Sequence, residues 1–364
     1  MSTVTSISEV ELGSTSTLAA WSEVSPADLP SWNDTLFRSG ASLYQFPFWN
    51  EPYRRMGLTP RYLRWGMQGR ALAAVTILTV GFGPGKIGLV FRGPARLTNE
   101  EDLPSNLFSE LVSWARSRGY MFLRFTHSDP EMLSRLAAAG EAIDGSVFPY
   151  FLDYSILSGD YVVKQHQYDE ETLASFDREA RRKIRRATEA GYEFQSSTCP
   201  KLLSEIWPMF EECSRTKHFR MERPLSFYMD LMAGAAENQL ARLYTVHHGE
   251  KIVGATLIFK DRDTAHCQLA AFDAEHRQSA TLLHWHAMRD MYRMGARYYN
   301  LGPGPGSLAR FKSTLCANPV QYPAPLTIVI RKKWFAIWKK AFLPVAKQLH
   351  PMFRHLALRR SALS

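Results

Sequence analysis

Two pairs of segments in this chain repeat each other at nearly the same separation, about half the chain length apart. The first pair is YLRWGMQGRALAAVTILT at Tyr62–Thr79 and RLYTVHHGEKIVGATLIF at Arg242–Phe259, which align at an offset of 180. The second pair is LVSWARSRGYMFLRF at Leu111–Phe125 and AMRDMYRMGARYYNL at Ala287–Leu301, at an offset of 176. Two landmarks in the same order at nearly equal offsets indicate a tandem duplication. We therefore expect two similar domains with a cleft between them, where ligand sites tend to lie.

The pattern of apolar residues predicts the same content in each half. The first repeated segment predicts a β-hairpin, and the second predicts an amphipathic helix, a glycine and a short strand. Each half is therefore expected to be a mixed sheet flanked by helices, which is an α/β (α+β) fold. We expect a disordered Ser/Thr-rich segment at 1–20 and a first domain at 21–156, which a strand at 148–156 closes. A second domain at 157–330 is expected to end in a strand at 325–330, and a basic tail at 331–364 follows it.

Several function classes are disfavoured by the composition. The four cysteines show no CxxC spacing and are expected to be free thiols in a reducing compartment. No HExxH motif occurs, and His284 and His286 would face different sides of a helix, so no metal site is predicted. The N-terminus lacks the features of a signal peptide, and no apolar run reaches about 18 residues. We therefore expect a cytoplasmic protein.

The positive charge of the chain is concentrated at its C-terminal end. The net charge is +9, and residues 331–364 contain nine Lys or Arg and no acidic residue. Aromatic and aliphatic residues are interspersed with these cations, as in a basic amphipathic helix. Such a helix suits an anionic membrane surface, or an RNA backbone. The alternative is a terminal helix whose aromatic side chains pack on the body of the protein.

A second basic cluster, REARRKIRR at Arg178–Arg186, lies at the start of the second half. On a helix, Arg178, Arg182 and Arg185 or Arg186 share one face. Glu179 alone does not neutralise them. The cluster suits a phosphate or diphosphate, which arginine forks bind well. A solvated helix face is the alternative reading.

A loop rich in glycine and proline, Gly302–Gly306, precedes a short helix that carries Phe311 and Lys312. A lone lysine at such a place is ordinarily solvated. Inside a cleft, however, it would stabilise an oxyanion that develops during acyl transfer.

Three segments resemble the Fem-type aminoacyltransferases, which build peptidoglycan interpeptide bridges and belong to the wider GNAT superfamily. The first is LYQFPFW at Leu43–Trp49 followed by YRRMG at Tyr53–Gly57. The second is RRKIRRA at Arg181–Ala187, followed by Ala190-Gly191-Tyr192, which is similar to the family signature R-x-x-I-R-x-A…G. The third is the Gly-rich loop with Phe311-Lys312. The resemblance covers roughly residues 40–330.

The resemblance implies two tandem GNAT-like domains and a transferase that acts in peptidoglycan biosynthesis, cell-wall biogenesis and cell shape. The donor would be aminoacyl-tRNA, the acceptor a lipid- or nucleotide-linked muropeptide, and no cofactor would be needed. By resemblance Lys312 and Phe311 would be catalytic, and Arg182, Lys183 and Arg186 would lie near the acceptor diphosphate. Further substrate-binding residues would be Gln45, Trp49, Arg54, Arg215 and Tyr228.

The sequence also departs from the family pattern. No long coiled-coil arm is predicted between the halves. The stretch Arg277–Thr281, where a GNAT pyrophosphate loop would fall, contains no glycine, and glycine permits close approach of the backbone to phosphate. This favours aminoacyl-tRNA over acyl-CoA as donor.

Two other functions stay open at the sequence level. One is an acyl-CoA-dependent N-acyltransferase acting on a sugar, a lipid or a small amine. The other is a non-catalytic module that binds an anionic partner through the Arg cluster and the tail. For an enzyme that acts on a lipid-linked precursor, residues 331–360 would make peripheral contact with the inner face of the membrane. For an enzyme, Asp273, Glu275 and His276 are the candidate general bases.

Overall fold

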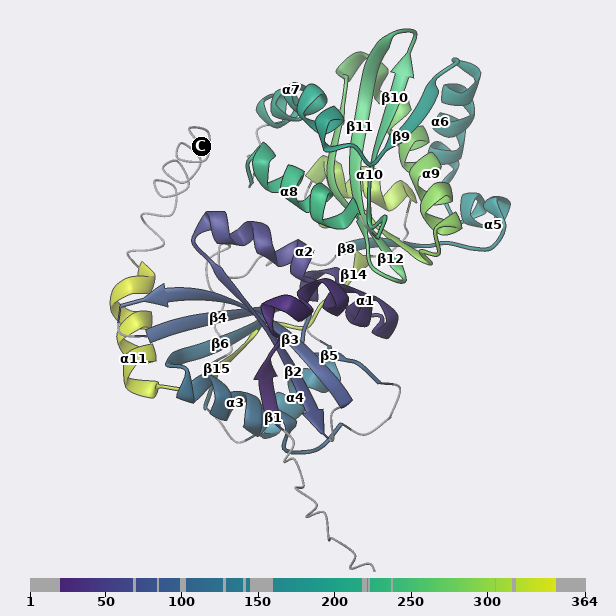
Figure 1. The fold of residues 1–364 in the computed structure, drawn as a ribbon. Coiled ribbons are helices and arrows are strands. Elements are labelled where there is room, and N and C mark those ends of the chain that lie inside the picture. Colours follow the sequence, from purple (N-terminus) through teal and green to yellow (C-terminus); the bar gives the residue numbers. More distant parts are fainter. Residues whose placement is uncertain are drawn as a thin grey trace, which may run out of the picture.

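A computed structural model of the chain describes residues 20–67, 70–83, 85–98, 103–126, 129–139, 142–144, 160–217, 221, 223–236, 238–304, 306–315 and 319–344. These residues form two mixed sheets with helices on their faces, which confirms the α/β class and the two tandem domains (Figure 1). The predicted disorder of residues 1–20 lies outside the described residues except at Ala20, which begins the strand β1. The predicted strand at 148–156 and the end of the tail from 345 also lie outside them.

The first sheet has the strand order β1-β2-β3-β4-β6-β15-β7, with the short β5 beside β3. Its β4 and β6 run parallel, and all its other neighbours run antiparallel. The strands are β1 (Ala20–Glu23), β2 (Thr59–Met67), β3 (Arg70–Phe82), β4 (Gly85–Phe91), β5 (Ala95–Arg96), β6 (Tyr120–Thr126), β7 (Ala142–Asp144) and β15 (Leu326–Val329).

The second sheet repeats this arrangement, except that its described strands include no counterpart of β5. Its order is β9-β10-β11-β12-β13-β8-β14, and β12 and β13 are its parallel pair. The strands are β8 (Asp160–Lys164), β9 (Glu193–Ser197), β10 (Ala241–His248), β11 (Lys251–Lys260), β12 (Thr264–Phe272), β13 (Tyr298–Asn300) and β14 (Pro319–Val320). The equal order and the equal directions confirm the duplication.

The aligned glycines of the second repeat also correspond in conformation. Gly119 has φ 84° and Gly295 has φ 94°. Each follows the helix before a parallel strand, α3 (Leu107–Ser117) in the first domain and α9 (Arg277–Arg293) in the second. A left-handed residue after a helix reverses the chain, and glycine adopts this conformation without a steric penalty.

The two domains exchange one strand each, which differs from the sequence-based boundaries. The strand expected at 325–330 to end the second domain is β15, and it pairs with β6 and β7 in the first sheet. The equivalent place beside β13 is taken by β8, from the middle of the chain. An apolar strand pattern indicates burial but not which sheet supplies the partner, so the sequence did not reveal the exchange. The chain therefore crosses twice between the domains.

Helices cover both faces of the second sheet. The helix α6 packs with α9 on one face, whereas α7 and α8 share a core with the first domain on the other. The basic cluster Arg178–Arg186 lies on α6, which begins after Asp177, because the Asp177 carboxylate accepts a hydrogen bond from the Ala180 amide at 2.7 Å and caps the helix. The second-domain helices are α5 (Asp169–Ala174), α6 (Arg178–Glu189), α7 (Pro200–Thr216), α8 (Leu225–Ala236), α9, α10 (Gly306–Leu315) and the 3-10 helix η4 (Ala274–His276).

The first domain contributes its helices to the interface and to the outer face of its sheet. Trp49 lies between the domains, with its ring centroid 5.4 Å from those of both Tyr44 and Phe259. The remaining helices are α1 (Leu29–Ser39), α2 (Pro47–Asn50), α4 (Pro130–Ala138), and the 3-10 helices η1 (Pro26–Asp28), η2 (Leu43–Gln45) and η3 (Glu51–Met56).

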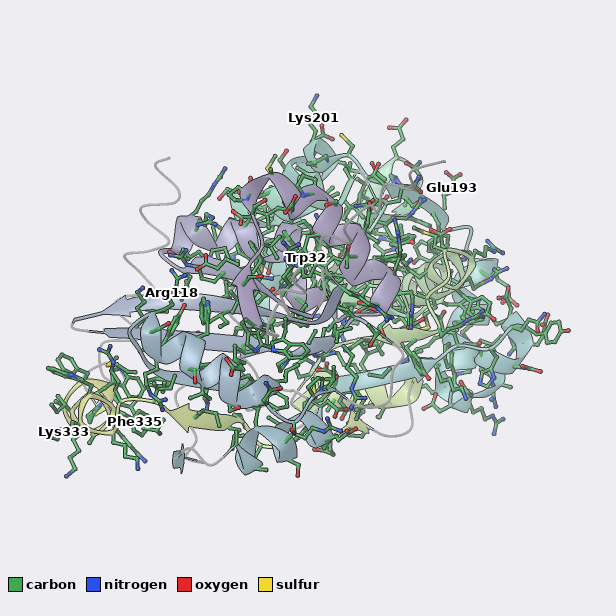
Figure 2. All side chains as sticks on the ribbon, turned by 60° about the horizontal axis from the view of Figure 1, so that its bottom comes forward. Trp32, Arg118, Glu193, Lys201, Lys333 and Phe335 are labelled. Atoms are coloured by element: carbon green, nitrogen blue, oxygen red, sulfur yellow. The ribbon has the colours of Figure 1, made fainter. Side chains whose placement is uncertain are left out.

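The basic tail begins with α11 (Lys332–Ile337) and a π-helical turn, η5 (Trp338–Phe342), at the edge of the first domain. Phe335 and Trp338 are buried, with ring centroids 5.2 and 4.8 Å from Phe122. This confirms packing on the body for the first part of the tail. Trp334 and Ile337 are exposed, and Lys333 lies on the outer side of the helix (Figure 2). Among the described helices, none is both long and apolar enough to span a bilayer.

Candidate active site

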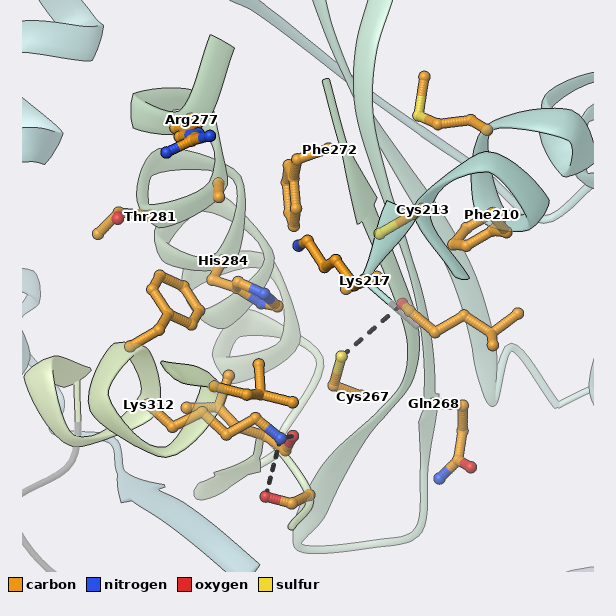
Figure 3. A pocket seen from close by; sticks show the side chains of 18 of the residues that line it. Phe210, Cys213, Lys217, Cys267, Gln268, Phe272, Arg277, Thr281, His284 and Lys312 are labelled. Atoms are coloured by element: carbon orange, nitrogen blue, oxygen red, sulfur yellow. Dashed lines mark hydrogen bonds between the residues drawn. The ribbon is translucent and has the colours of Figure 1, made fainter. Parts of the chain in front are cut away.

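A pocket of about 1760 Å³ lies at the open edge of β12 in the second domain, where Tyr44, Phe91 and Arg92 of the first domain also reach it. The strands β12 and β13 pair only from Thr264 to His266, with Tyr298 to Asn300 as partners. Within the described part of the chain, no strand pairs with this edge of β12 beyond His266. The pocket occupies the gap that opens there (Figure 3).

The pocket is bounded by side chains from both faces of the second sheet. Phe272 and Phe311 pack against the core under α6 and α9, whereas Phe210, Tyr228 and Leu269 belong to the core under α7 and α8. A β-bulge places Gln268 between the paired residues Cys267 and Leu269, and Gln268 also lines the pocket. A bulge re-aims side chains and is common beside active sites. A ligand in this pocket therefore meets both faces of the sheet.

Lys312 fixes the Gly-Pro loop at the gap. Its Nζ donates to the carbonyl oxygen of Leu301, and to those of Gly302 at 3.0 Å and Pro303 at 2.7 Å. An ammonium has three donors, so these carbonyls use all of them. Burial lowers the pKa of Lys312, although Cys267 and Asp160 favour its charged form. Lys312 and Phe311, both predicted site residues, thus line the pocket, and Lys312 also sets the course of the loop.

His284 stands in the apolar part of the pocket near Phe272 and Phe311 (Figure 3). Its Nδ1 lies 3.0 Å from the hydroxyl of Tyr299. Burial and the positive charge of Lys312 lower the pKa of His284 to about 3. This imidazole is therefore neutral across the physiological range. His286, two residues on, stacks on Phe194 outside the pocket, as the helical spacing predicts.

The lining of the pocket is strongly basic. It includes nine Lys or Arg side chains and three carboxylates. Arg182, Lys183 and Arg186 of α6 are among them, because Ala180, Ile184 and Ala187 bury the opposite face of that helix. Lys183 also pairs with Glu179 at 2.5 Å. Such a lining favours a ligand that carries phosphate or another anion.

Where the domains meet, a buried polar cluster that was not predicted from the sequence lies beside the pocket. Arg92 donates to Asp160 at 2.8 Å and to the Tyr322 hydroxyl at 2.6 Å, and Asn300 donates to the same carboxylate at 2.7 Å. The Arg92 guanidinium lies over the rings of Tyr44 and Tyr322. Burial would raise the pKa of Asp160, but Arg92, Asn300 and Tyr322 hold it below its usual value. In the sequence, the sign of this cluster is a charged residue, Arg92, at the end of an apolar strand.

Arg92 also has an unusual backbone. Its φ is 51°, a region that non-glycine residues occupy only when the surrounding structure holds them there. Its Nε is buried and has no hydrogen-bond partner among the residues that the structure describes. Strain of this kind is typical of sites at which a side chain must be held in one position.

Of the other predicted substrate-binding residues, Tyr228 lines the pocket, whereas Gln45, Trp49, Arg54 and Arg215 do not line it. Gln45 is buried and bridges the Phe91 carbonyl at 2.6 Å and the Thr76 amide at 2.8 Å. Arg54 and Arg215 are exposed and pair with Glu51 and Glu212 on their own helices. Gln45 therefore supports the pocket residue Phe91 through a hydrogen bond, and Trp49 supports the pocket residue Tyr44 through a ring contact.

Of the three candidate general bases, only Asp273 lines the pocket. Asp273 lines the pocket but pairs with Lys251 at 2.7 Å, and that hydrogen bond lowers the pKa of Asp273. Glu275 and His276 do not line the pocket, and His276 Nδ1 lies 3.0 Å from the Tyr192 hydroxyl. Within the described ranges, no group of three or more His, Cys, Asp or Glu is arranged to hold a metal ion.

Comparison with known proteins shows a domain match and a similar fold. Residues 174–313 match the model of the acetyltransferase (GNAT) domain. No curated protein sequence matches the chain significantly. The fold is similar to the crystal structure of FemX, with a TM-score of 0.72 and 13% identity over 88% of this chain and 100% of that one.

Two further solved structures have a similar fold with lower TM-scores. They are L-PGS from Bacillus licheniformis, with a TM-score of 0.56 and 16% identity over 90% of this chain and 96% of that one, and the C-terminal domain of a putative lysylphosphatidylglycerol synthetase from Agrobacterium fabrum, with a TM-score of 0.53 and 16% identity over 86% and 96%. Residues 174–313 therefore match a GNAT domain, and the fold of the chain is similar to that of FemX.

Proposed function

We propose that this protein transfers an aminoacyl group from aminoacyl-tRNA to an amine of a peptidoglycan precursor or a similar phosphate-bearing acceptor of the cell envelope. One observation carries this proposal. A single pocket runs through the gap between β12 and β13, so a donor on one face of the sheet and an acceptor on the other would meet at the open edge of β12. Two bulky substrates need such access from both sides.

The lining suits the chemistry of acyl transfer. The neutral amine attacks the ester carbonyl, and a tetrahedral intermediate with a negatively charged oxygen follows. The ester is already activated, so much of the rate comes from positioning. Lys312 supplies positive potential beside the gap and holds the loop Leu301–Pro303 in place. Arg182, Lys183 and Arg186 would bind the phosphates of the acceptor.

The start of α9 supports tRNA over coenzyme A as the source of the acyl group. The residues Arg277, Gln278 and Ala280 line the pocket there, and the stretch to Thr281 contains no glycine. A pyrophosphate seated on a helix N-terminus requires close approach of the backbone, which side chains obstruct. The match to the GNAT acetyltransferase model favours acyl-CoA instead, so the same assay must include it.

The test is a mass measurement on a UDP-linked muropeptide incubated with purified protein. One reaction contains charged total tRNA, a second contains the same tRNA treated with RNase, and a third contains acetyl-CoA. The proposal predicts a gain of one amino-acid residue mass that RNase abolishes. A CoA-dependent acetyl gain would establish the second candidate. No gain on any of a panel of amine acceptors, together with tight binding of the anionic acceptor, would contradict catalysis and favour a binding module.

We also propose that the start of the tail contacts an anionic membrane surface. Trp334 and Ile337 are exposed on α11 while Phe335 is buried beneath them, and the adjacent Lys332 and Lys333 are exposed. Exposed apolar side chains flanked by lysines suit the boundary between headgroups and acyl chains. A lipid-linked acceptor would be presented at that surface.

Because Phe335 and Trp338 belong to the core, deletion of the tail would damage the fold, and surface substitutions give the cleaner test. Reversal of both charges in Lys332→Glu/Lys333→Glu should abolish most of the pelleting with vesicles that contain phosphatidylglycerol. The matched control is Lys164→Glu/Lys201→Glu, at exposed lysines of the second domain. Equal pelleting of both variants, or binding to RNA but not to vesicles, would contradict membrane contact.

A further inference from the structure

His266 lies at the point where the two parallel strands part. It is the last residue of β12 that pairs with β13, opposite Asn300, and it lines the pocket. Its ring faces the first domain, with its centroid 6.3 Å from that of Tyr44. A group that entered the gap from this face would therefore pass His266 before it reached the open edge of β12.

The carboxylate of Asp261 contacts this histidine and orients its ring. His266 Nε2 lies 3.1 Å from Asp261 Oδ2. Asp261 is buried and fixed by the amides of Thr264 at 2.8 Å, Asp263 at 3.2 Å and Leu43 at 3.3 Å. Burial would raise the pKa of Asp261, but its hydrogen bonds to His266 and to these amides hold that pKa below its usual value, so Asp261 is ionised. Asp261 does not line the pocket.

This contact leaves the other ring nitrogen for the pocket. Nδ1 of His266 has no hydrogen-bond partner among the described residues. A carboxylate on one nitrogen fixes the tautomer and the ring orientation, and it stabilises the imidazolium that forms when the other nitrogen accepts a proton. The charged and titratable groups around His266 are Asp261 behind it, Asp160 and Arg92 beside it, and the Tyr44 phenol.

The carboxylates of the pocket and Lys312 already have partners, and Glu212 pairs with Arg215. Asp160 and Asp273 are ion-paired, and Lys312 uses its three donors on backbone carbonyls. The second pocket histidine, His284, faces Lys312 rather than a carboxylate, and its pKa of about 3 makes it a weak base. A carboxylate thus lies beside His266, whereas a cation lies beside His284. Surroundings of opposite charge suit His266 to acid–base chemistry and keep His284 neutral.

We propose that His266, oriented by Asp261, is the general base that accepts the proton of the attacking amine, a role that rests on the proposed acyl transfer. As the amine nitrogen forms its bond to the ester carbonyl carbon, its proton passes to His266 Nδ1. When the tetrahedral intermediate collapses, the bond from that carbon to the donor oxygen breaks, and His266 returns the proton to this oxygen. The products are an amide and a free hydroxyl on the donor, and His266 is neutral again.

The first test is kinetic. In His266→Gln the amide still donates to Asp261 but accepts no proton, so kcat should fall by about 100-fold or more while the acceptor KM changes little. Addition of imidazole to His266→Ala should restore part of kcat, which a purely structural role would not allow. The control is His286→Gln, which lies outside the pocket and should retain full activity. A fall in kcat of less than threefold in His266→Gln would overturn the proposal.

A second measurement does not depend on turnover. Diethyl pyrocarbonate modifies accessible neutral imidazoles, and mass spectrometry locates the product. In the folded protein His266 should be modified faster than His284, and bound UDP-muropeptide should protect it. If the wild-type protein transfers no acyl group at all, the proposed function fails, and this labelling still decides on His266. Absence of modification at His266 while exposed histidines react would show that no substrate amine can reach it.

Discussion

The two parallel strand pairs of this molecule have the same neighbours and directions but end differently. In the first domain, β4 and β6 stay paired from Lys86 to Phe91, and every residue of β6 is buried. In the second domain, β12 and β13 pair at three positions and then separate around the pocket. One copy of the duplicated unit therefore closes its sheet with apolar side chains, whereas the other leaves an edge of backbone open.

The cause of this difference lies in the chain that follows the second strand of each pair. The strand β6 continues for seven residues, and Gly88 of β4 packs directly against the Leu123 side chain. The strand β13 has three residues, after which Gly302 turns with φ 70° and its carbonyl accepts a hydrogen bond from Lys312. A site thus arises where a parallel strand ends early and a buried cation holds the departing loop. The same fold thus contains one half with a closed strand pair and one half whose open strand edge lines the pocket.

The largest effect on turnover is expected when the positive charge of Lys312 is removed. In Lys312→Met, the three carbonyls of the loop lose their shared donor, so the loop should move into the gap and kcat should fall by about 100-fold to 1000-fold. The control is Lys260→Met, a buried lysine that donates to the Met294 carbonyl at 2.9 Å away from this pocket. It should lose stability and keep its kcat. Equal kcat losses in both variants would contradict a special role for Lys312.

A second test introduces a larger side chain at each parallel strand pair in turn, first beside the open pair and then within the closed pair. Ala280→Trp places an indole in the pocket and should lower kcat/KM by roughly 10-fold to 100-fold with little change in stability, since space is available there. Gly88→Ala introduces a Cβ 2.5 Å from Leu123 Cδ2, so it should lower the unfolding free energy by about 1–3 kcal/mol and leave kcat unchanged. Urea unfolding and initial rates measure both. The reverse assignment of effects would refute the division into a closed and an open pair.

The sequence reveals the features of this comparison that depend on local patterns. The helix–glycine–strand repeat located Gly119 and Gly295, and the short motifs located Lys312, Phe311 and the cluster on α6. The sequence did not reveal contacts between residues far apart in the chain. Arg92 meets Asp160 and Tyr322 only because β8 and β15 change places between the sheets. No periodicity encodes that exchange, and without it a strand-end arginine carries no sign of its partners.

The same limit explains the residues that the structure places outside the pocket. Gln45 and Trp49 lie in a motif with a family resemblance, and both are buried near the site. A motif marks a region, however, and does not distinguish a side chain that contacts ligand from one that supports its neighbour. Only the hydrogen bonds of Gln45 to Phe91 and Thr76 assign it to the supporting layer.

A third prediction concerns the neutral histidine of the open pair. Folding lowers the pKa of His284 from its usual value of 6.5 to about 3, so between these pH values the unfolded chain binds a proton that the folded chain does not. This contribution to stability is complete above pH 6.5 and declines by about 1.4 kcal/mol per pH unit as the pH falls toward 3. In His284→Gln this part of the slope should disappear. Urea unfolding of both proteins at pH 7, 6 and 5 measures it, and identical slopes would show that His284 is not held neutral by the pocket.

The smallest expected effect tests the basic face of the open half. Arg182 and Arg185 lie on the same exposed surface of α6, but only Arg182 lines the pocket. Arg182→Ala should raise the acceptor KM by about 3-fold to 10-fold, because an exposed charge–phosphate contact contributes on the order of 1 kcal/mol. Arg185→Ala should leave KM within twofold. Because solvent ions screen such contacts, the difference between the variants should shrink as the salt concentration rises from 50 mM to 500 mM. Equal KM values for both variants at low salt would mean that α6 contributes only a general positive field, and that the specific anion contacts lie on the α7 and α9 sides of the pocket.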